Sequence, residues 1–64
     1  MMELFEEIFS AVCEENDMDW YEVFDGALMD EVNDRIMRAT GMTMDELEDN
    51  DEYCEWYGDM AEDL

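Results

Sequence analysis

The sequence predicts an all-α protein, a small single domain of three to four helices. Apolar side chains recur every three to four residues in several stretches, the spacing that gathers them on one face of a helix. The chain has no proline and only three glycines, so few residues interrupt a helix. Its 64 residues limit it to one domain, and an apolar content of 48% is too high for a disordered acidic tail.

The first predicted helix covers residues 2–15. Its apolar stripe follows the positions i, i+1, i+4, i+5, i+8 and i+9, which are Leu4, Phe5, Ile8, Phe9, Val12 and Cys13. Acidic residues take the opposite side and the first turn, where they interact favourably with the helix dipole. We therefore expect this helix to pack on the rest of the domain through its stripe.

A second helix is predicted over residues 20–40, with a kink or a short break near Gly26. Asp19 and Glu22 have the spacing of a capping box at its start. A glycine in a helix interior costs about 1 kcal/mol, and Asp25 is placed to cap the continuation. After the glycine the apolar face rotates onto a new stripe, formed by Leu28, Val32, Ile36 and Ala39.

Both arginines lie late in this helix, each four residues after an acid. Glu31 precedes Arg35 and Asp34 precedes Arg38, the favourable orientation for ion pairs within a helix. Gly41 then provides the C-cap. The two cations are therefore expected to have local, structural roles.

Two further helices are predicted over residues 44–49 and 52–62. Thr43 and Glu46 form a capping box at the start of the first, and Asn50 with Asp51 favours a turn between them. One continuous helix is the alternative. An apolar stripe supports that alternative, formed by Leu47, Cys54, Tyr57, Ala61 and Leu64.

Methionine and cysteine side chains are open to more than one interpretation. Met29 and Met37 share a helical face that is either an adaptable binding surface or a second packing face. Cys13 and Cys54 are expected to be buried, reduced thiols, because two cysteines argue little for a disulfide and are too few for a zinc site.

The sequence contains no recognisable catalytic constellation. It has no histidine and no glycine-rich phosphate loop, and carboxylates are too abundant to mark an active site. Calcium-loop frames that start at Asp17 and Asp49 both lack the required glycine at the sixth position. We therefore expect no enzyme activity, no cofactor and no specific metal site.

The net charge is the most informative feature of the chain. Twenty-two acidic residues face two arginines, which gives −20, whereas a charge of about 2–8 suffices for the solubility of a small domain. Such a surface repels nucleic acid and anionic membranes directly. However, carboxylates spaced at i, i+3 and i+4 lie about 5–6 Å apart on a helix and can imitate a row of phosphates. The predicted partner is therefore a protein with a DNA-binding channel rich in lysine and arginine.

The predicted partner-binding surface is centred on residues 45–55, where seven of eleven residues are acidic. Its expected contacts from this region are Asp45, Glu46, Glu48, Asp49, Asp51, Glu52, Glu55 and Trp56. Trp56, with Tyr53 and Tyr57, is expected to serve as an aromatic anchor among the acids. A second acidic cluster is expected to extend this surface, formed by Glu14, Glu15, Asp17 and Asp19.

The whole chain resembles the small, highly acidic DNA-mimic proteins of bacteriophages, which include inhibitors of restriction enzymes and anti-CRISPR proteins. The likeness lies in size, extreme acidity, absence of lysine and helical content. The stretches T-G-M-T-M-D-E-L-E-D and E-W-Y-G-D are also similar to short phage proteins of unknown role. The resemblance implies an inhibitor that occupies the DNA site of a host CRISPR effector, restriction enzyme or repair enzyme.

Other functions and the cellular location are also expectations at this point. With no targeting segment and no apolar run long enough to span a membrane, the chain is expected in the cytoplasm of a host bacterial cell. One alternative is an acidic adaptor or activation segment that folds on a partner protein. Another is an acidic protein that binds divalent cations without specificity.

Overall fold

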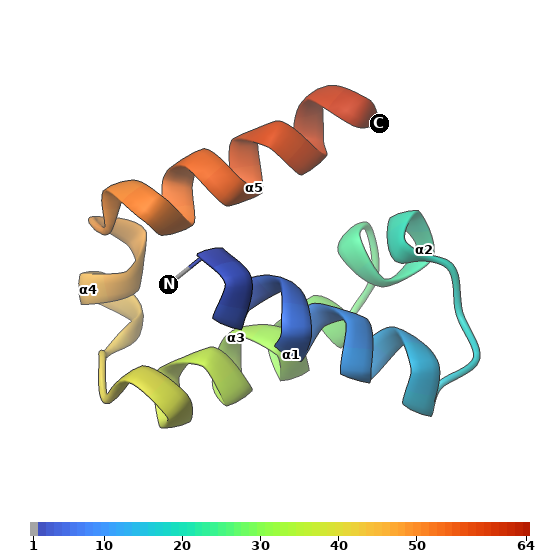
Figure 1. The fold of residues 1–64 in the computed structure, drawn as a ribbon, viewed down its shortest axis with the longest axis horizontal. Helices are drawn as coiled ribbons and strands as arrows, with labels where there is room; N and C mark the ends of the chain where they lie inside the picture. The colour runs from blue at the N-terminus through green and yellow to red at the C-terminus, as the bar shows by residue number, and fades with distance from the viewer. Residues whose placement is uncertain (1) are drawn as a thin grey trace.

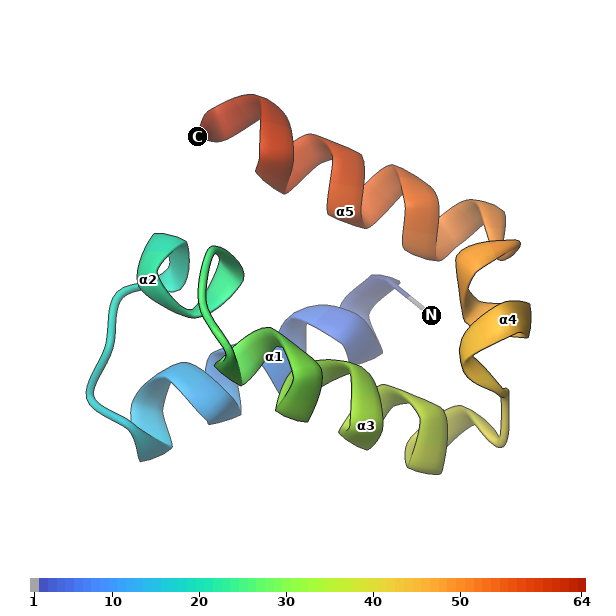
Figure 2. The same ribbon diagram turned by 180° about the vertical axis from the view of Figure 1, so that it is seen from behind.

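A computed structural model describes residues 2–64 and confirms the all-α prediction. Five helices form within these residues: α1 (Met2–Glu15), α2 (Trp20–Phe24), α3 (Leu28–Thr40), α4 (Met44–Glu48) and α5 (Asp51–Asp63). In Figure 1, α1 and α3 lie side by side, and α5 runs along the top of the molecule, where it packs against α1. The short helices close the two ends of this arrangement, with α4 linking α3 to α5 and α2 at the opposite end (Figure 2).

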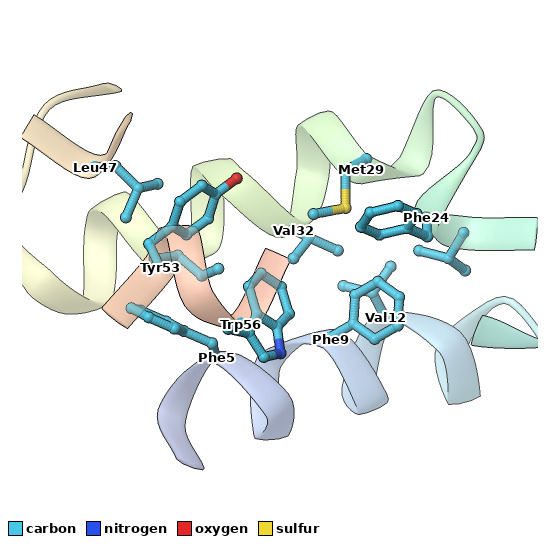
Figure 3. Packing of buried hydrophobic residues seen from close by; sticks show 11 residues of the cluster. Phe5, Phe9, Val12, Phe24, Met29, Val32, Leu47, Tyr53 and Trp56 are labelled. Atoms are coloured by element: carbon cyan, nitrogen blue, oxygen red, sulfur yellow. The ribbon is translucent and has the colours of Figure 1, made fainter. Parts of the chain in front are cut away.

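The core is apolar and includes side chains from every helix. Its buried residues are Phe5, Phe9, Val12, Val23, Phe24, Met29, Val32, Ile36, Leu47, Tyr53 and Trp56. Aromatic rings form its centre, where Phe5 and Phe9 of α1 meet Trp56 of α5 at ring-centroid distances of 5.5 and 5.9 Å. Figure 3 shows these rings between the two helices. This aromatic contact holds α5 on α1.

The predicted helix over residues 20–40 is broken rather than kinked. Gly26 lies in a turn between α2 and α3, and a Cβ atom built there would be only 2.8 Å from the backbone oxygen of Glu22. The last turn of α2 thus lies so close to Gly26 that a larger residue could fit only if the backbone shifted. Asp25 does not cap the continuation, since Ala27 is the N-cap of α3 and makes no side-chain hydrogen bond.

The expected capping box at Asp19 is also absent. Asp19 is the N-cap of α2 by position, but its side chain accepts no hydrogen bond from the helix backbone. Its carboxylate accepts one from the Tyr21 hydroxyl at 3.0 Å instead. The competing phenol therefore replaces the backbone donor that the spacing predicted.

The remaining start and stop signals are confirmed. Gly41 ends α3 with a left-handed φ of 75°, and its N–H donates to the oxygen of Met37 at 2.8 Å. Thr43 and Glu46 form the complete capping box at α4. Asn50 then separates α4 from α5 and accepts from the N–H of Tyr53 at 2.9 Å, so the C-terminal region is two helices.

The predicted apolar face of α5 is wrong. The expected stripe faces solvent at Cys54, Tyr57, Ala61 and Leu64. Tyr53 and Trp56 are buried in their place, and half-buried Met60 packs against the core one turn later. Tyr53, Trp56 and Met60 together offer more apolar surface than Cys54, Tyr57 and Ala61 do, so they determine which face of the helix turns inward.

The methionine face of α3 is a packing face. Met29 is 7% exposed, and Met37 is half-buried against the core. Of the two interpretations of this face, the structure supports the second. Both methionines fill space between helices, as the flexible side chain often does.

Candidate protein-binding surface

Charged side chains are kept out of the core of this molecule. No charged side chain is buried among residues 2–64. All the carboxylates are exposed except that of Asp34, which is half-buried. The body that carries them measures only 29 × 24 × 20 Å, so its negative charge is concentrated on a small surface.

The acidic residues of the 45–55 region lie on α4, at its C-cap Asp49 and on the first turns of α5. All seven are exposed, as the prediction requires. The turn at Asn50 changes the chain direction between them, so the acids follow two short helices rather than one straight row (Figure 1). Glu46 has a structural role as well, because its carboxylate accepts from the N–H of Thr43 at 3.2 Å.

The expected aromatic anchor is only partly available. Trp56 is 3% exposed and packs against Phe5 and Phe9, so it cannot contact a partner in this conformation. Tyr53 is also buried, and its hydroxyl donates to Asn33 at 2.7 Å. Tyr57 is 40% exposed and is the one member of the predicted trio that reaches the surface. Two of the three predicted anchor residues therefore belong to the core instead.

The environment of Tyr53 changes its acidity. Burial is the main cause that raises the pKa of its phenol to about 12, and the charges of Tyr57 and Glu48 act in the same direction. The hydrogen bond to Asn33 opposes this shift. The Tyr53 side chain is thus a neutral member of the core at ordinary pH.

The second predicted cluster does not extend the first. Glu14 and Glu15 end α1, and Asp17 and Asp19 lie in the connection to α2. This connection is at the opposite end of the molecule from α4 in both views (Figures 1 and 2). The two acidic clusters therefore belong to different ends of the surface.

Glu15 is further occupied by an ion pair that the sequence did not predict. Its two oxygens accept from the guanidinium of Arg35 at 2.7 and 2.8 Å, while Glu31 accepts from the same guanidinium at 3.1 Å. The hydrogen bonds from Arg35 lower the pKa of the Glu15 carboxyl, and the two acids raise the pKa of Arg35. The predicted pairs Glu31–Arg35 and Asp34–Arg38 are both present at 3.1 Å.

A row of acids on the outer face of α1 was not included in the predicted surface. Glu3, Glu7 and Glu14, with Ser10 between them, recur at steps of four, three and four residues and line a shallow hollow. At 1.5 Å per residue the row is about 16 Å long. The helical period of these acids was the signal that could have identified it.

The two cysteines have different environments and are both free thiols. Cys13 is half-buried, and burial raises the pKa of its thiol. Cys54 is exposed, and its S–H donates to the carbonyl oxygen of Glu48 at 3.1 Å. The expectation of a buried thiol is wrong for Cys54, because α5 turns this residue outward.

Residues 2–64 contain neither a cluster of metal ligands nor a helix that could span a membrane. No three cysteine, aspartate or glutamate side chains there are grouped to hold a metal ion. No helix in this part of the chain has the length and apolar character needed to cross a bilayer.

Comparison with known protein families, curated proteins and solved structures finds no match for this chain. Inferences about its function therefore rest on its own surface.

Proposed function

We propose that the protein is a DNA mimic that inhibits a host nucleic-acid-binding defence complex, of the CRISPR or restriction type. It binds the basic DNA-recognition surface of that complex and excludes DNA. The observation that carries this proposal is charge density. Duplex DNA has one negative charge per 1.7 Å of axis, so a duplex 29 Å long carries about 17 phosphates. This protein presents a net charge of −20 on a body whose longest extent is 29 Å.

The placement of the charges supports the same proposal. The carboxylates project from helices that a shared apolar core holds in place, so the charged surface is ordered before a partner arrives. Both arginines are engaged in ion pairs within the chain. A channel lined with lysine and arginine would attract this surface rapidly at low salt. The bound protein would then exclude DNA from the same channel.

The preformed core favours this function over that of an adaptor segment. A segment that folds only on its partner gives a coil spectrum when it is alone, whereas a domain with its own core melts cooperatively. We expect circular dichroism of the isolated protein to show a cooperative helical melt. The proposed site of action is the host bacterial cytoplasm.

A competition assay tests the proposal. Labelled duplex DNA is bound to each of several CRISPR effector complexes and restriction enzymes, and the protein is titrated in at low salt. We expect displacement of DNA from at least one of these complexes, and weaker displacement as salt rises. Failure to displace DNA from every member of the panel at low salt would remove the support for a DNA mimic.

Two matched variants locate the binding surface. One changes Glu48, Asp49, Asp51 and Glu55 to their amides, and the other changes Glu3, Glu6, Glu7 and Glu14 to glutamine. Each removes four charges, so a purely non-specific attraction is weakened equally by both. We expect the first variant to displace DNA less well than the second. The reverse order would move the contact surface to α1.

A further inference from the structure

An open cleft lies between the α2–α3 corner and the α4–α5 arm of the fold. Its volume is about 610 Å³. Its lining includes Phe24, Asp25 and Asp30 on one side and Glu48, Tyr57 and Gly58 on the other. The cleft therefore combines aromatic and acidic side chains from segments that are far apart in the sequence.

The floor of the cleft is aromatic. The rings of Phe24 and Tyr57 pack directly on each other there, with centroids 4.7 Å apart and a tilt of 46°. Phe24 is 8% exposed, whereas Tyr57 is 40% exposed and leaves part of its ring accessible. Met29 lies beside Phe24 at this end of the core (Figure 3). The exposed part of Tyr57 is therefore the aromatic surface that an incoming group can contact.

The cleft is also lined by carboxylates that have no cation of their own. Asp25 comes from the α2–α3 turn, Asp30 from α3 and Glu48 from α4, and all three are exposed. Within residues 2–64 none of these side chains makes an ion pair or a hydrogen bond. Their charges are therefore available to a cation that enters between them.

Gly58 helps to keep the cleft open. It lies in the middle of α5, and a Cβ atom built there meets no other atom within 4 Å. Glycine in a helix interior is destabilising, so the stability of the helix does not explain why residue 58 is a glycine. The missing side chain leaves open space on the side of α5 that lines the cleft.

We propose that this cleft receives an arginine side chain from a basic segment of a partner protein. A guanidinium is planar, weakly hydrated and able to stack on an aromatic ring while its N–H groups donate to carboxylates. A lysine ammonium matches the charge but stacks less well and is more strongly hydrated. The inference rests on the proposed function and adds one defined contact to it.

Neither this chain nor a second copy of it is a suitable source of that arginine. Arg35 and Arg38 are already paired with acids on their own side of the molecule. A second copy would bring another net charge of −20 against the first. The occupant is therefore a positively charged segment of a different protein.

Peptides of nine arginines and nine lysines test this inference, because they carry equal charge. Calorimetric titration at low salt gives the affinity of each peptide for the protein. We expect nona-arginine to bind about fivefold more tightly, the size of one partly exposed cation–π contact. Equal affinities would contradict the proposal that the cleft binds arginine. DNA displacement in the competition assay would still support the proposed function.

Two variants assign the preference to the cleft. Replacing Asp25 and Asp30 with asparagine should abolish the preference for arginine. Replacing Glu3 and Glu7 with glutamine removes the same charge from α1 and should weaken both peptides equally, leaving the ratio at about fivefold. A ratio that survives the first change, or disappears with the second, would refute the assignment.

The Gly58→Leu variant tests the cleft without removing any of its acidic residues. Its side chain should project into the open space and fill the cleft, so nona-arginine should lose its advantage over nona-lysine. A cooperative helical melt of the variant would show that the domain still folds.

The unmodified protein offers a further measurement, since exposed Cys54 lies at the cleft. Nona-arginine should protect Cys54 from maleimide more than nona-lysine does, and equal protection would contradict the proposal.

Discussion

Gly58→Ala should stabilise the protein, and the size of the gain follows from its position. Gly58 is in the interior of α5, where glycine is about 0.8–1.0 kcal/mol less favourable than alanine. The added Cβ meets nothing within 4 Å, so no packing term opposes this gain. For a domain of this size, 1 kcal/mol shifts the melting temperature by about 4–8 °C. We therefore expect the melting temperature to rise by about 3–8 °C.

Gly26→Ala is the matched control for this change, because it adds the same methyl group where there is no room. Its Cβ would lie 2.8 Å from the backbone oxygen of Glu22, which cannot rotate away. Overpacking of this kind costs about 1–3 kcal/mol. Thermal melts followed by far-ultraviolet circular dichroism compare both variants with the parent protein. A lower melting temperature for Gly58→Ala would show that the space beside α5 is closed and would refute the reasoning for both the helix and the cleft.

Three further predictions concern charge. Added salt should raise the melting temperature by several degrees, because it screens carboxylates that repel one another; an unchanged melting temperature would contradict this account. Stability should fall by roughly 2 kcal/mol as pH rises from 10 to 12, because the unfolded state releases the phenolic proton of Tyr53 first; denaturation at several pH values should show a shallower fall in Tyr53→Phe. Arg35→Gln should lower the melting temperature more than Arg38→Gln, because Arg35 joins α1 to α3 whereas Arg38 pairs only within its own helix; equal effects would show that the Glu15 contact contributes nothing.

Signals that act within a few residues predicted the structure well. The capping box at Thr43, the C-cap at Gly41 and the turn at Asn50 all depend on hydrogen bonds to nearby backbone, and all three are present. Two of the predicted caps failed because another local contact took their place. Asp19 bonds the phenol of Tyr21 two residues away instead of its helix backbone, and Ala27 rather than Asp25 is the N-cap after the predicted break at Gly26.

In the candidate surface, some features follow from the charge of each residue and others depend on how the helices are arranged. The exposure of the acids follows from charge alone, because burying an unpaired carboxylate is prohibitively costly. Which acids gather together depends on the arrangement of the helices, and this separated Asp17 and Asp19 from the cluster on α4 and α5. The burial of Trp56 depends on the same arrangement, since the rings that cover it belong to α1. Neither could be read from the spacing within one helix.

Because the charged side chains lie outside the core, a surface whose charges repel one another is compatible with a stable fold. Repulsion among the carboxylates opposes folding, and the apolar core must exceed that cost in the free protein. A basic partner cancels the repulsion without touching the core, because no buried side chain of residues 2–64 is charged. Binding should therefore release electrostatic strain that the fold already bears, and the complex should melt at a higher temperature than the isolated protein. On this view the excess charge lowers the stability of the free protein in order to increase its affinity for a channel that normally holds DNA.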